Sequence, residues 1–399
     1  MGSRRITSTE RPYIEDVLDR YCVPGHNLTM MALGSSHWGP PVAALEGVCK
    51  FVASRETQRY GNILGLPELR ERLTRRLASV GLRCLEEGGE MTLAVTSGAN
   101  QAFTNIALTL CDEGDKAVLL SPYYFSHKLA LQLAGVQVSV SEFDPQTHKP
   151  DLDALSRLVD ETKPRVLVMT TPCNPSGVVY SRADLEAIVE LCRRHKTWLV
   201  VDQVYYEFLY DGAAHVFPCN RAMDYDRIVH IFSLSKCFGM AGWRVGYAVF
   251  PNALTEDFRK VQDTNPTHAT ILSQRLALEC LAADEDAPGT GWVETEVRSL
   301  DRVRAALWEI LGPLGTVKSQ GAFYFLVPLP AEVSEEEAVD ILASKFGVLL
   351  MLGWPFGAPQ HLRLSYGGLH PDSAMDSLGR LQRGLQEISR LASERRDAS

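Results

Sequence analysis

Seven short runs of apolar and β-branched residues punctuate the chain between residues 90 and 250. Several are apolar at consecutive rather than alternate positions, which is typical of strands buried on both faces. Amphipathic stretches with helical spacing lie among them. This pattern predicts an α/β fold in which a mostly parallel seven-stranded sheet lies between helices. The runs cover 91–97, 116–121, 136–143, 165–171, 197–202, 227–233 and 243–250.

The pattern of predicted elements changes after about residue 303, where strands and helices no longer alternate regularly. Strands are expected at 321–327 and 361–368, and helices around 306–311 and over 334–347 and 371–392. The last residues, from about Ser389, are polar and are expected to fray. We therefore predict a smaller α+β domain at 301–399, a large domain at 46–300, and an N-terminal arm at 1–45 that joins the smaller domain.

Composition excludes several classes of protein. Of the 399 residues 45% are apolar and 22% charged, as in ordinary folded proteins, and the net charge of −9 would repel nucleic acid. The nine cysteines are widely spaced without a C-x-x-C pair, which favours free thiols and predicts no metal site. No apolar run reaches the roughly 18 residues that cross a bilayer, and the first residues lack the apolar core of a secretory signal. A cytoplasmic protein is expected.

Lys236 is the most informative candidate for chemistry. It follows a predicted buried strand, at the edge where open α/β sheets bind ligands, with Ser233 three residues before it and Arg244 eight after. A lysine in that position is a Schiff-base candidate. Two alternatives remain open for the lysine alone: an acylating Ser-x-x-Lys motif, although no Lys-Thr-Gly follows it, or a solvated loop lysine.

Two turns after predicted strands would suit a bound ligand. Gly98, Ala99 and Asn100 lie between a strand and a helix, where free N–H groups and the helix dipole can hold a phosphate, although such a turn is often only a helix cap. Asn174 lies between two prolines directly after another strand, and the alternative there is a purely structural turn.

An acid also ends a predicted strand. Asp202 closes an apolar run, with Tyr205 three residues later. A buried carboxylate usually requires a cationic partner, so Asp202 is expected to have one.

Together these segments resemble the fold type I pyridoxal-phosphate aminotransferases of class I/II. The likeness spans about residues 30 to 385 and is closest to plant aromatic aminotransferases that use methionine as donor. The motifs occur in the family's order: Tyr60-Gly61, S-G-A-N, S-P-Y-Y, N-P-S-G, D-x-x-Y, S-x-S-K followed by G-W-R-V-G, and R-L-S-Y-G.

The resemblance implies pyridoxal 5'-phosphate as cofactor and assigns roles around its ring. Lys236 would form the Schiff base and shuttle a proton. Asp202 would pair with the pyridine nitrogen, and Tyr205 and Asn174 would bond to the phenolic oxygen. Tyr124 would stack on the ring.

The resemblance also implies how the two ends of the site are held. The phosphate would be bound at Gly98, Ala99 and Asn100 and by Ser233 and Arg244. Tyr60 would reach the phosphate of a neighbouring subunit, which implies a homodimer; the alternative is an aromatic residue that merely flanks a helix. Arg363 would clamp the substrate carboxylate, the alternative being an exposed strand arginine.

Substrate selectivity is inferred from a missing charge. No arginine lies between Lys260 and Arg275, where relatives specific for dicarboxylates would carry a second one. The loop with Gly34 would border the substrate, and Trp38 would either cover an aromatic or thioether side chain or pack between the domains.

These residues predict a transaminase that acts on an aromatic amino acid or methionine and a 2-oxo acid. A lyase on the same scaffold, a cysteine-conjugate β-lyase or a relative of aminocyclopropane-carboxylate synthase, is the alternative. A regulator that only binds the cofactor is a third possibility, and the intact Lys236 argues against it.

Overall fold

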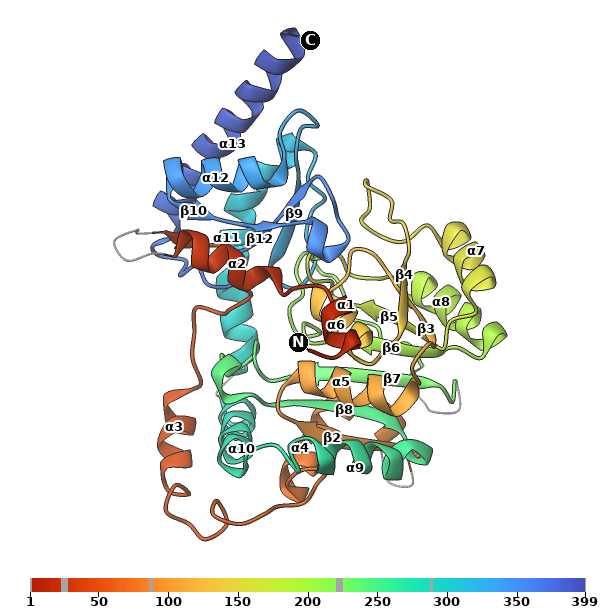
Figure 1. Ribbon diagram of the computed structural model, residues 1–399. Helices are drawn as coiled ribbons and strands as arrows, with labels where there is room; N and C mark the ends of the chain where they lie inside the picture. Colours follow the sequence, from red (N-terminus) through yellow and green to blue (C-terminus); the bar gives the residue numbers. More distant parts are fainter. Residues whose placement is uncertain (1, 23–27, 86–88, 220–224, 288–289, 399) are drawn as a thin grey trace.

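The computed structural model describes residues 2–22, 28–85, 89–219, 225–287 and 290–398. Its centre is a seven-stranded sheet of order β2-β8-β7-β6-β5-β3-β4 (Figure 1). All neighbouring strands are parallel except β8, which is antiparallel to both β2 and β7. The predicted α/β fold is therefore confirmed. The strands are β2 Met91–Thr96, β3 Lys116–Leu119, β4 Gln137–Val140, β5 Val166–Thr170, β6 Trp198–Asp202, β7 Ile228–Ser233 and β8 Gly246–Pro251.

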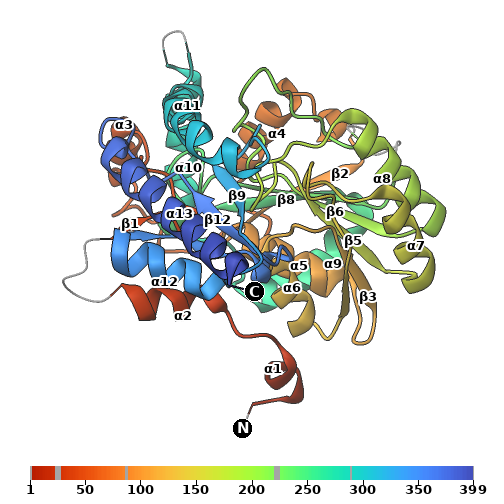
Figure 2. The ribbon, with the colours of Figure 1, turned by 90° about the horizontal axis from the view of Figure 1, so that it is seen from above.

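The sheet is buried on both faces, as consecutive apolar positions predict. Alternate residues of one strand enter different hydrophobic clusters: Leu167 packs on one face and Val168 on the other. Figure 2 shows α4 and α8 on one side of the sheet and α5, α6 and α9 on the other. These helices are α4 Pro67–Ser79, α5 Ala99–Leu110, α6 Phe125–Leu133, α8 Arg182–His195 and α9 Thr255–Thr264, with α7 Leu152–Thr162 and α10 Ile271–Glu285 on the α4 side.

One strand begins later than predicted. The run 243–250 was expected to be extended, but Ala241–Trp243 is a 3-10 helix and Arg244 has a φ of +54°. A residue in the left-handed region cannot continue a strand ladder, so β8 starts at Gly246. Arg244 is thereby turned out of the sheet at its edge.

A smaller unit combines both ends of the chain, as predicted. Strand β1 pairs in parallel with β10, and β9 and β11 flank β12 in an antiparallel sheet. The predicted boundary at residue 301 lies within the continuous helix α11, so this helix runs from one unit into the other (Figure 1). The elements of this unit are β1 Thr29–Met30, β9 Tyr324–Pro328, β10 Val348–Leu349, β11 Met351–Leu352, β12 His361–Ser365, α2 Tyr13–Tyr21, α11 Trp292–Leu311, α12 Glu335–Phe346 and α13 Ala374–Asp397. Two other N-terminal helices pack on the large unit: α1 Arg4–Ser8 contacts α6, and α3 Val42–Cys49 contacts α10.

The tail does not fray where expected. Helix α13 continues to Asp397, and the side chain of Arg395 pairs with Glu337 of α12 at 2.7 Å. Polar composition predicted fraying, but contacts with α12 that the local sequence does not reveal hold the helix. Within the described residues, no helix has the length and apolarity to cross a bilayer.

Candidate active site

Side chains from both units surround a cavity of about 260 Å³. It lies where β5, β6 and β7 reach the carboxyl edge of the central sheet, the place where open α/β sheets bind ligands. Two larger cavities, of about 560 and 600 Å³, lie beside His215 and contain none of the residues that the sequence assigns to a site. The smaller cavity is lined by Ile14, Leu33, Gly34, Ser35, Ala99, Asn100, Tyr124, Phe125, Thr170, Asn174, Asp202, Val204, Tyr205, Ser233, Ser235, Lys236, Arg244, Tyr324 and Arg363.

Lys236 enters the cavity from the turn after β7. Its Nζ donates a hydrogen bond to the carbonyl oxygen of Gly34 at 2.5 Å, across the two units. Burial, reinforced by the positive charges of Arg244 and Arg363, lowers the pKa of Lys236 to about 8, although Asp202 opposes the shift. An appreciable fraction of the amine is therefore unprotonated near neutral pH, which makes it a nucleophile and a base.

Asp202 ends β6 with both carboxylate oxygens oriented. Oδ2 lies 3.0 Å from Nε2 of His127, and Oδ1 accepts a hydrogen bond from the N–H of Val204 at 3.1 Å. The partner that the buried acid requires is thus a histidine on α6, which the sequence analysis did not identify. No local signal connects the two residues, because they meet only when α6 packs on the sheet.

An anion-binding cradle lies at the N-terminus of α5. Gly98 has a φ of +87° and is the N-cap, without a side-chain cap, so the N–H groups of the first turn face outward. A Cβ on Gly98 would lie 2.3 Å from Nη2 of Arg244, and one on Gly246 would lie 2.5 Å from the nitrogen of Ala99. Both glycines are therefore required for this close approach of backbone and guanidinium.

Two hydroxyls of the cavity wall are unpaired. Thr170 Oγ1 and Ser235 Oγ are buried and have no hydrogen-bond partner among the described residues. Ser233 Oγ, in contrast, accepts from the N–H of Ser235 at 3.1 Å. Orphaned hydroxyls beside a cationic, N–H-rich cradle fit a polar, phosphate-bearing ligand. Ser235 was missed by the sequence analysis, although it lies within the quoted S-x-S-K motif.

The opposite end of the cavity carries a buried guanidinium. Arg363 is 2% exposed, donates to Oδ1 of Asn174 at 3.2 Å, and contacts the carbonyl oxygen of Ala32. Its guanidinium carbon lies 5.1 Å from the ring centre of Tyr324 and 4.5 Å from that of Phe356. Arg363 is therefore no exposed strand arginine, and it presents a positive charge between aromatic rings.

Tyrosines complete the cavity between these ends. The hydroxyl of Tyr205 lies 2.5 Å from that of Tyr324, and the ring of Tyr124 meets that of His127 edge-on at 5.4 Å. Tyr324 was also missed by the sequence analysis. It occurs in an apolar strand, GAFYFLV, where a tyrosine looks like ordinary core.

Three predicted site residues are absent from the cavity lining: Gly98, which directly precedes the lining residues Ala99 and Asn100, and Trp38 and Tyr60. Trp38 is buried, donates from Nε1 to the carbonyl oxygen of Cys237 at 3.0 Å, and stacks on Phe208, which corresponds to the packing alternative. Tyr60 is 89% exposed and contacts only the edge of His268 among aromatic rings of the described chain. Neither Trp38 nor Tyr60 faces the cavity of this chain.

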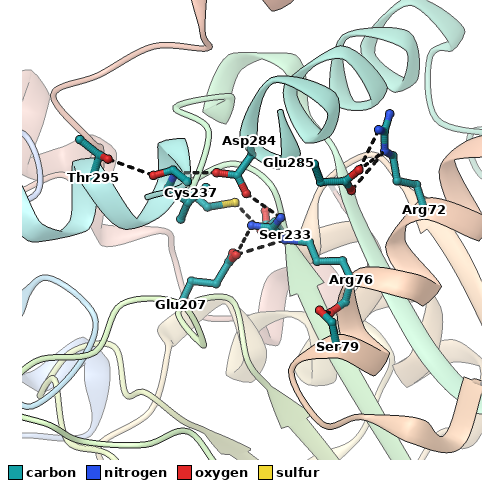
Figure 3. Close-up of polar contacts among 11 residues, drawn as sticks. Arg72, Arg76, Ser79, Glu207, Ser233, Cys237, Asp284, Glu285 and Thr295 are labelled. Carbon is teal, nitrogen blue, oxygen red and sulfur yellow. Dashed lines mark hydrogen bonds and ion pairs between the residues drawn. The ribbon is translucent and has the colours of Figure 1, made fainter. Parts of the chain in front are cut away.

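A partly buried ion-pair network supports the turn that carries the lysine (Figure 3). Arg76 of α4 pairs with Glu207 and, at 2.7 Å, with Asp284, and its guanidinium carbon lies 5.7 Å from the ring centre of Phe238. Asp284 also accepts a hydrogen bond from the N–H of Val293 at the start of α11. The network therefore joins α4, the segment after β6 and the helix that leads into the smaller unit.

Known proteins share both the sequence and the fold. The family model for aminotransferase class I and II matches residues 31–379. The chain is a class I/II aminotransferase. This aminotransferase is 37% identical to the aromatic aminotransferase ISS1 of Arabidopsis thaliana, over 97% of each chain. It is 32% identical to the aspartate/prephenate aminotransferase of Thermus thermophilus, over 86% of this chain and 87% of that one.

Solved structures agree with this assignment. The aminotransferase superposes on aspartate aminotransferase from Thermus thermophilus with maleate at a TM-score of 0.86, with 29% identity, covering 96% of this chain and 100% of that one. A second match is the aromatic aminotransferase of Pyrococcus horikoshii, with a TM-score of 0.82, 26% identity and coverage of 94% and 99%. The predicted family is confirmed, and with it an enzyme that transfers amino groups with pyridoxal phosphate as cofactor.

Proposed function

We propose that this aminotransferase transfers the amino group between an aromatic amino acid or methionine and a 2-oxo acid. The observation that carries the proposal is the charge of the cavity wall. Its described lining contains three cationic side chains, of Lys236, Arg244 and Arg363. Arg244 lies beside the anion cradle, which leaves Arg363 for the α-carboxylate of the substrate.

Apolar and aromatic side chains, of Ile14, Leu33, Phe125 and Tyr324, line the cavity together with uncharged polar Ser35 and Asn174. The described part of the wall offers no further cation for a distal carboxylate. A neutral, bulky side chain is therefore favoured over that of aspartate or glutamate. The name of the Arabidopsis relative supports aromatic substrates, whereas those of several bacterial relatives specify aspartate.

The residues present fit the cofactor, which when bound supplies an aldehyde and an electron-accepting ring. Lys236 would provide the amine that binds the aldehyde and the base that moves the substrate's proton. Asp202, oriented by His127, would hold the ring nitrogen, and Tyr124 would cover a ring face. Asn174 and Tyr205 would bind the phenolic oxygen.

The phosphate would be held at the opposite side from Arg363. The first turn of α5, at Gly98, Ala99 and Asn100, would supply N–H groups, and Arg244 and Ser233 of the cavity wall would add their side chains. Charge-assisted bonds from N–H groups and a guanidinium suit three anionic oxygens.

The test is a single-turnover experiment that follows the absorption of the bound cofactor after addition of one amino acid at a time. L-Phenylalanine, L-tryptophan and L-methionine should each convert it rapidly, and L-glutamate and L-aspartate slowly. Faster conversion by the dicarboxylates would contradict the proposed selectivity. Release of ammonia without conversion would indicate the lyase instead, which no relative reported above favours.

We also propose a homodimer in which Tyr60 serves the neighbouring subunit's phosphate site. Its support is the exposure of a large aromatic side chain, together with exposed Val42 and Val52 nearby in the sequence. Inactive Lys236→Ala and impaired Tyr60→Ala chains should regain activity when mixed and allowed to exchange, because one of the two hybrid sites then receives both intact residues. No recovery, despite hybrids detected by mass, would place Tyr60 outside the neighbour's site.

A further inference from the structure

The hydroxyl of Tyr324 lies where three site groups meet. Tyr324 begins β9, is 1% exposed, and places its oxygen 2.5 Å from the hydroxyl oxygen of Tyr205. A Cβ on Gly34 would lie 2.2 Å from the same oxygen, so the Tyr324 hydroxyl lies directly against the backbone of Gly34. The carbonyl oxygen of Gly34 accepts the hydrogen bond from Lys236. Tyr324 thus contacts the loop that holds the lysine and the tyrosine proposed to face the cofactor.

Strand pairing places Tyr324 beside Arg363 as well. Tyr324 is opposite Ser365 and Leu326 is opposite Arg363 in the β9–β12 ladder, so Tyr324 and Arg363 are diagonal neighbours on one face. The guanidinium carbon lies 5.1 Å from the Tyr324 ring centre. A positive charge at this distance makes a phenol a better hydrogen-bond donor.

Both phenols keep their protons at neutral pH. Burial raises the pKa of Tyr324 to about 12, with Arg363 opposing the shift, and burial raises the pKa of Tyr205 well above its ordinary value. Two neutral hydroxyls share the one short contact, so one donates to the other, and the acceptor's own proton must point elsewhere.

The surroundings favour one direction for this hydrogen bond. The hydroxyl of Tyr324 has no partner other than Tyr205 within the described residues, and it is pressed against Gly34. If Tyr324 donates, its proton is satisfied, and the proton of Tyr205 is available to an acceptor in the cavity. The reverse direction turns the lone pairs of Tyr205 toward the cavity and directs its proton away from any acceptor there.

We propose that Tyr324 is a positioning residue of the transamination: it donates to Tyr205 and thereby aims the Tyr205 proton at the cofactor's phenolic oxygen. In a buried site each hydrogen bond of such a chain strengthens the next. Tyr324 therefore makes Tyr205 a stronger donor and stabilises the deprotonated form of the bound cofactor. The inference rests on the proposed role of Tyr205.

The experiment is a pH titration of the holoenzyme's absorption spectrum, without any amino acid present. It compares the parent enzyme with Tyr324→Phe, Tyr205→Phe, the double variant, and Tyr366→Phe as control. Tyr366 is equally buried in the same unit but does not line the cavity. Tyr324→Phe should raise the titration midpoint by about half a pH unit or more and lower kcat several-fold, whereas Tyr366→Phe should change neither.

The double variant decides whether Tyr324 acts through Tyr205. Tyr205→Phe should raise the midpoint further than Tyr324→Phe does, and removing Tyr324's hydroxyl in that background should add nothing. If Tyr324→Phe shifts the midpoint by the same amount in the parent enzyme and in the Tyr205→Phe background, the inference is overturned. It is also overturned if Tyr324→Phe leaves the parent's midpoint unchanged; in both cases the proposed role of Tyr205 stands. An unchanged midpoint in Tyr205→Phe would overturn the proposed role of Tyr205 and the inference with it.

Discussion

Nε2 of His127 lies 3.0 Å from Oδ2 of Asp202, and both side chains are almost completely buried. The imidazole ring is held in place by Phe103, whose ring centre is 4.2 Å away. Because the N–H of Val204 binds the other carboxylate oxygen, the carboxyl group of Asp202 has a fixed orientation at the cavity wall. Because the carboxyl group of Asp202 is already oriented, it does not have to rearrange when a cationic ring nitrogen approaches it.

Replacing His127 by leucine should therefore weaken cofactor binding. The loss of one partner of a buried carboxylate costs about 1–3 kcal/mol, which corresponds to a dissociation constant raised about 5- to 150-fold. Titration of the apoprotein with pyridoxal phosphate measures this dissociation constant. His195→Leu is the control, since His195 pairs with the exposed Asp160 at 3.3 Å, far from the cavity lining. Equal affinities in the two variants would contradict the role of His127.

Lys236 should make the stability of the apoprotein depend on pH. Its pKa of about 8 in the folded protein is below the unfolded value of about 10.4, so folding of the protonated form is penalised. The penalty is fully present below pH 8 and disappears as the pH rises toward the unfolded value. Lys236→Met should thus stabilise the apoprotein most below pH 8, and guanidinium unfolding at a series of pH values measures this. A gain in stability that is independent of pH would contradict the lowered pKa of Lys236. Lys260→Met, at an exposed position, is the control.

Arg363→Lys separates substrate binding from cofactor binding. Lysine keeps the positive charge but cannot form the two parallel hydrogen bonds of a guanidinium with a carboxylate. We expect kcat/KM to fall about 30- to 1000-fold, equivalent to about 2–4 kcal/mol, while the dissociation constant of the cofactor changes less than about threefold. Steady-state kinetics and apoprotein titration give the two values. If kcat/KM and the affinity for the cofactor fell by similar factors, the proposed contact of Arg363 with the substrate carboxylate would be wrong.

Two arginines of α4 offer a matched comparison of stability. The side chain of Arg76 is 13% exposed and pairs with Glu207 and Asp284, whereas that of Arg72, one turn earlier, is 24% exposed and pairs with the more exposed Glu285 (Figure 3). Arg76→Met leaves two carboxylates uncompensated and should lower the free energy of unfolding by about 3–5 kcal/mol. Arg72→Met should cost less than about 1 kcal/mol. Denaturant unfolding measures the free energy of unfolding of both variants. Similar losses in the two would show that the ion pairs of Arg76 stabilise the fold no more than the ion pair of Arg72 does.

Local chemistry explains why much of this site was predictable. Strand ends carry Asp202 and Ser233, and the glycine of the S-G-A-N turn begins a helix, so short patterns identify them without knowledge of their neighbours. The late start of β8 was not predictable, because the left-handed conformation of Arg244 depends on its position at the sheet edge.

The sequence by itself determined the buried parallel sheet, the family and the residues at strand ends, because apolar runs and polar turn residues act over a few positions. Tertiary structure alone decided which distant side chains meet: His127 with Asp202, Tyr324 with Tyr205, and Lys236 with the carbonyl of Gly34. It also excluded Trp38 from the cavity wall. These contacts depend on how α6 packs on the sheet and how the smaller unit closes over its edge, and no local pattern records that packing.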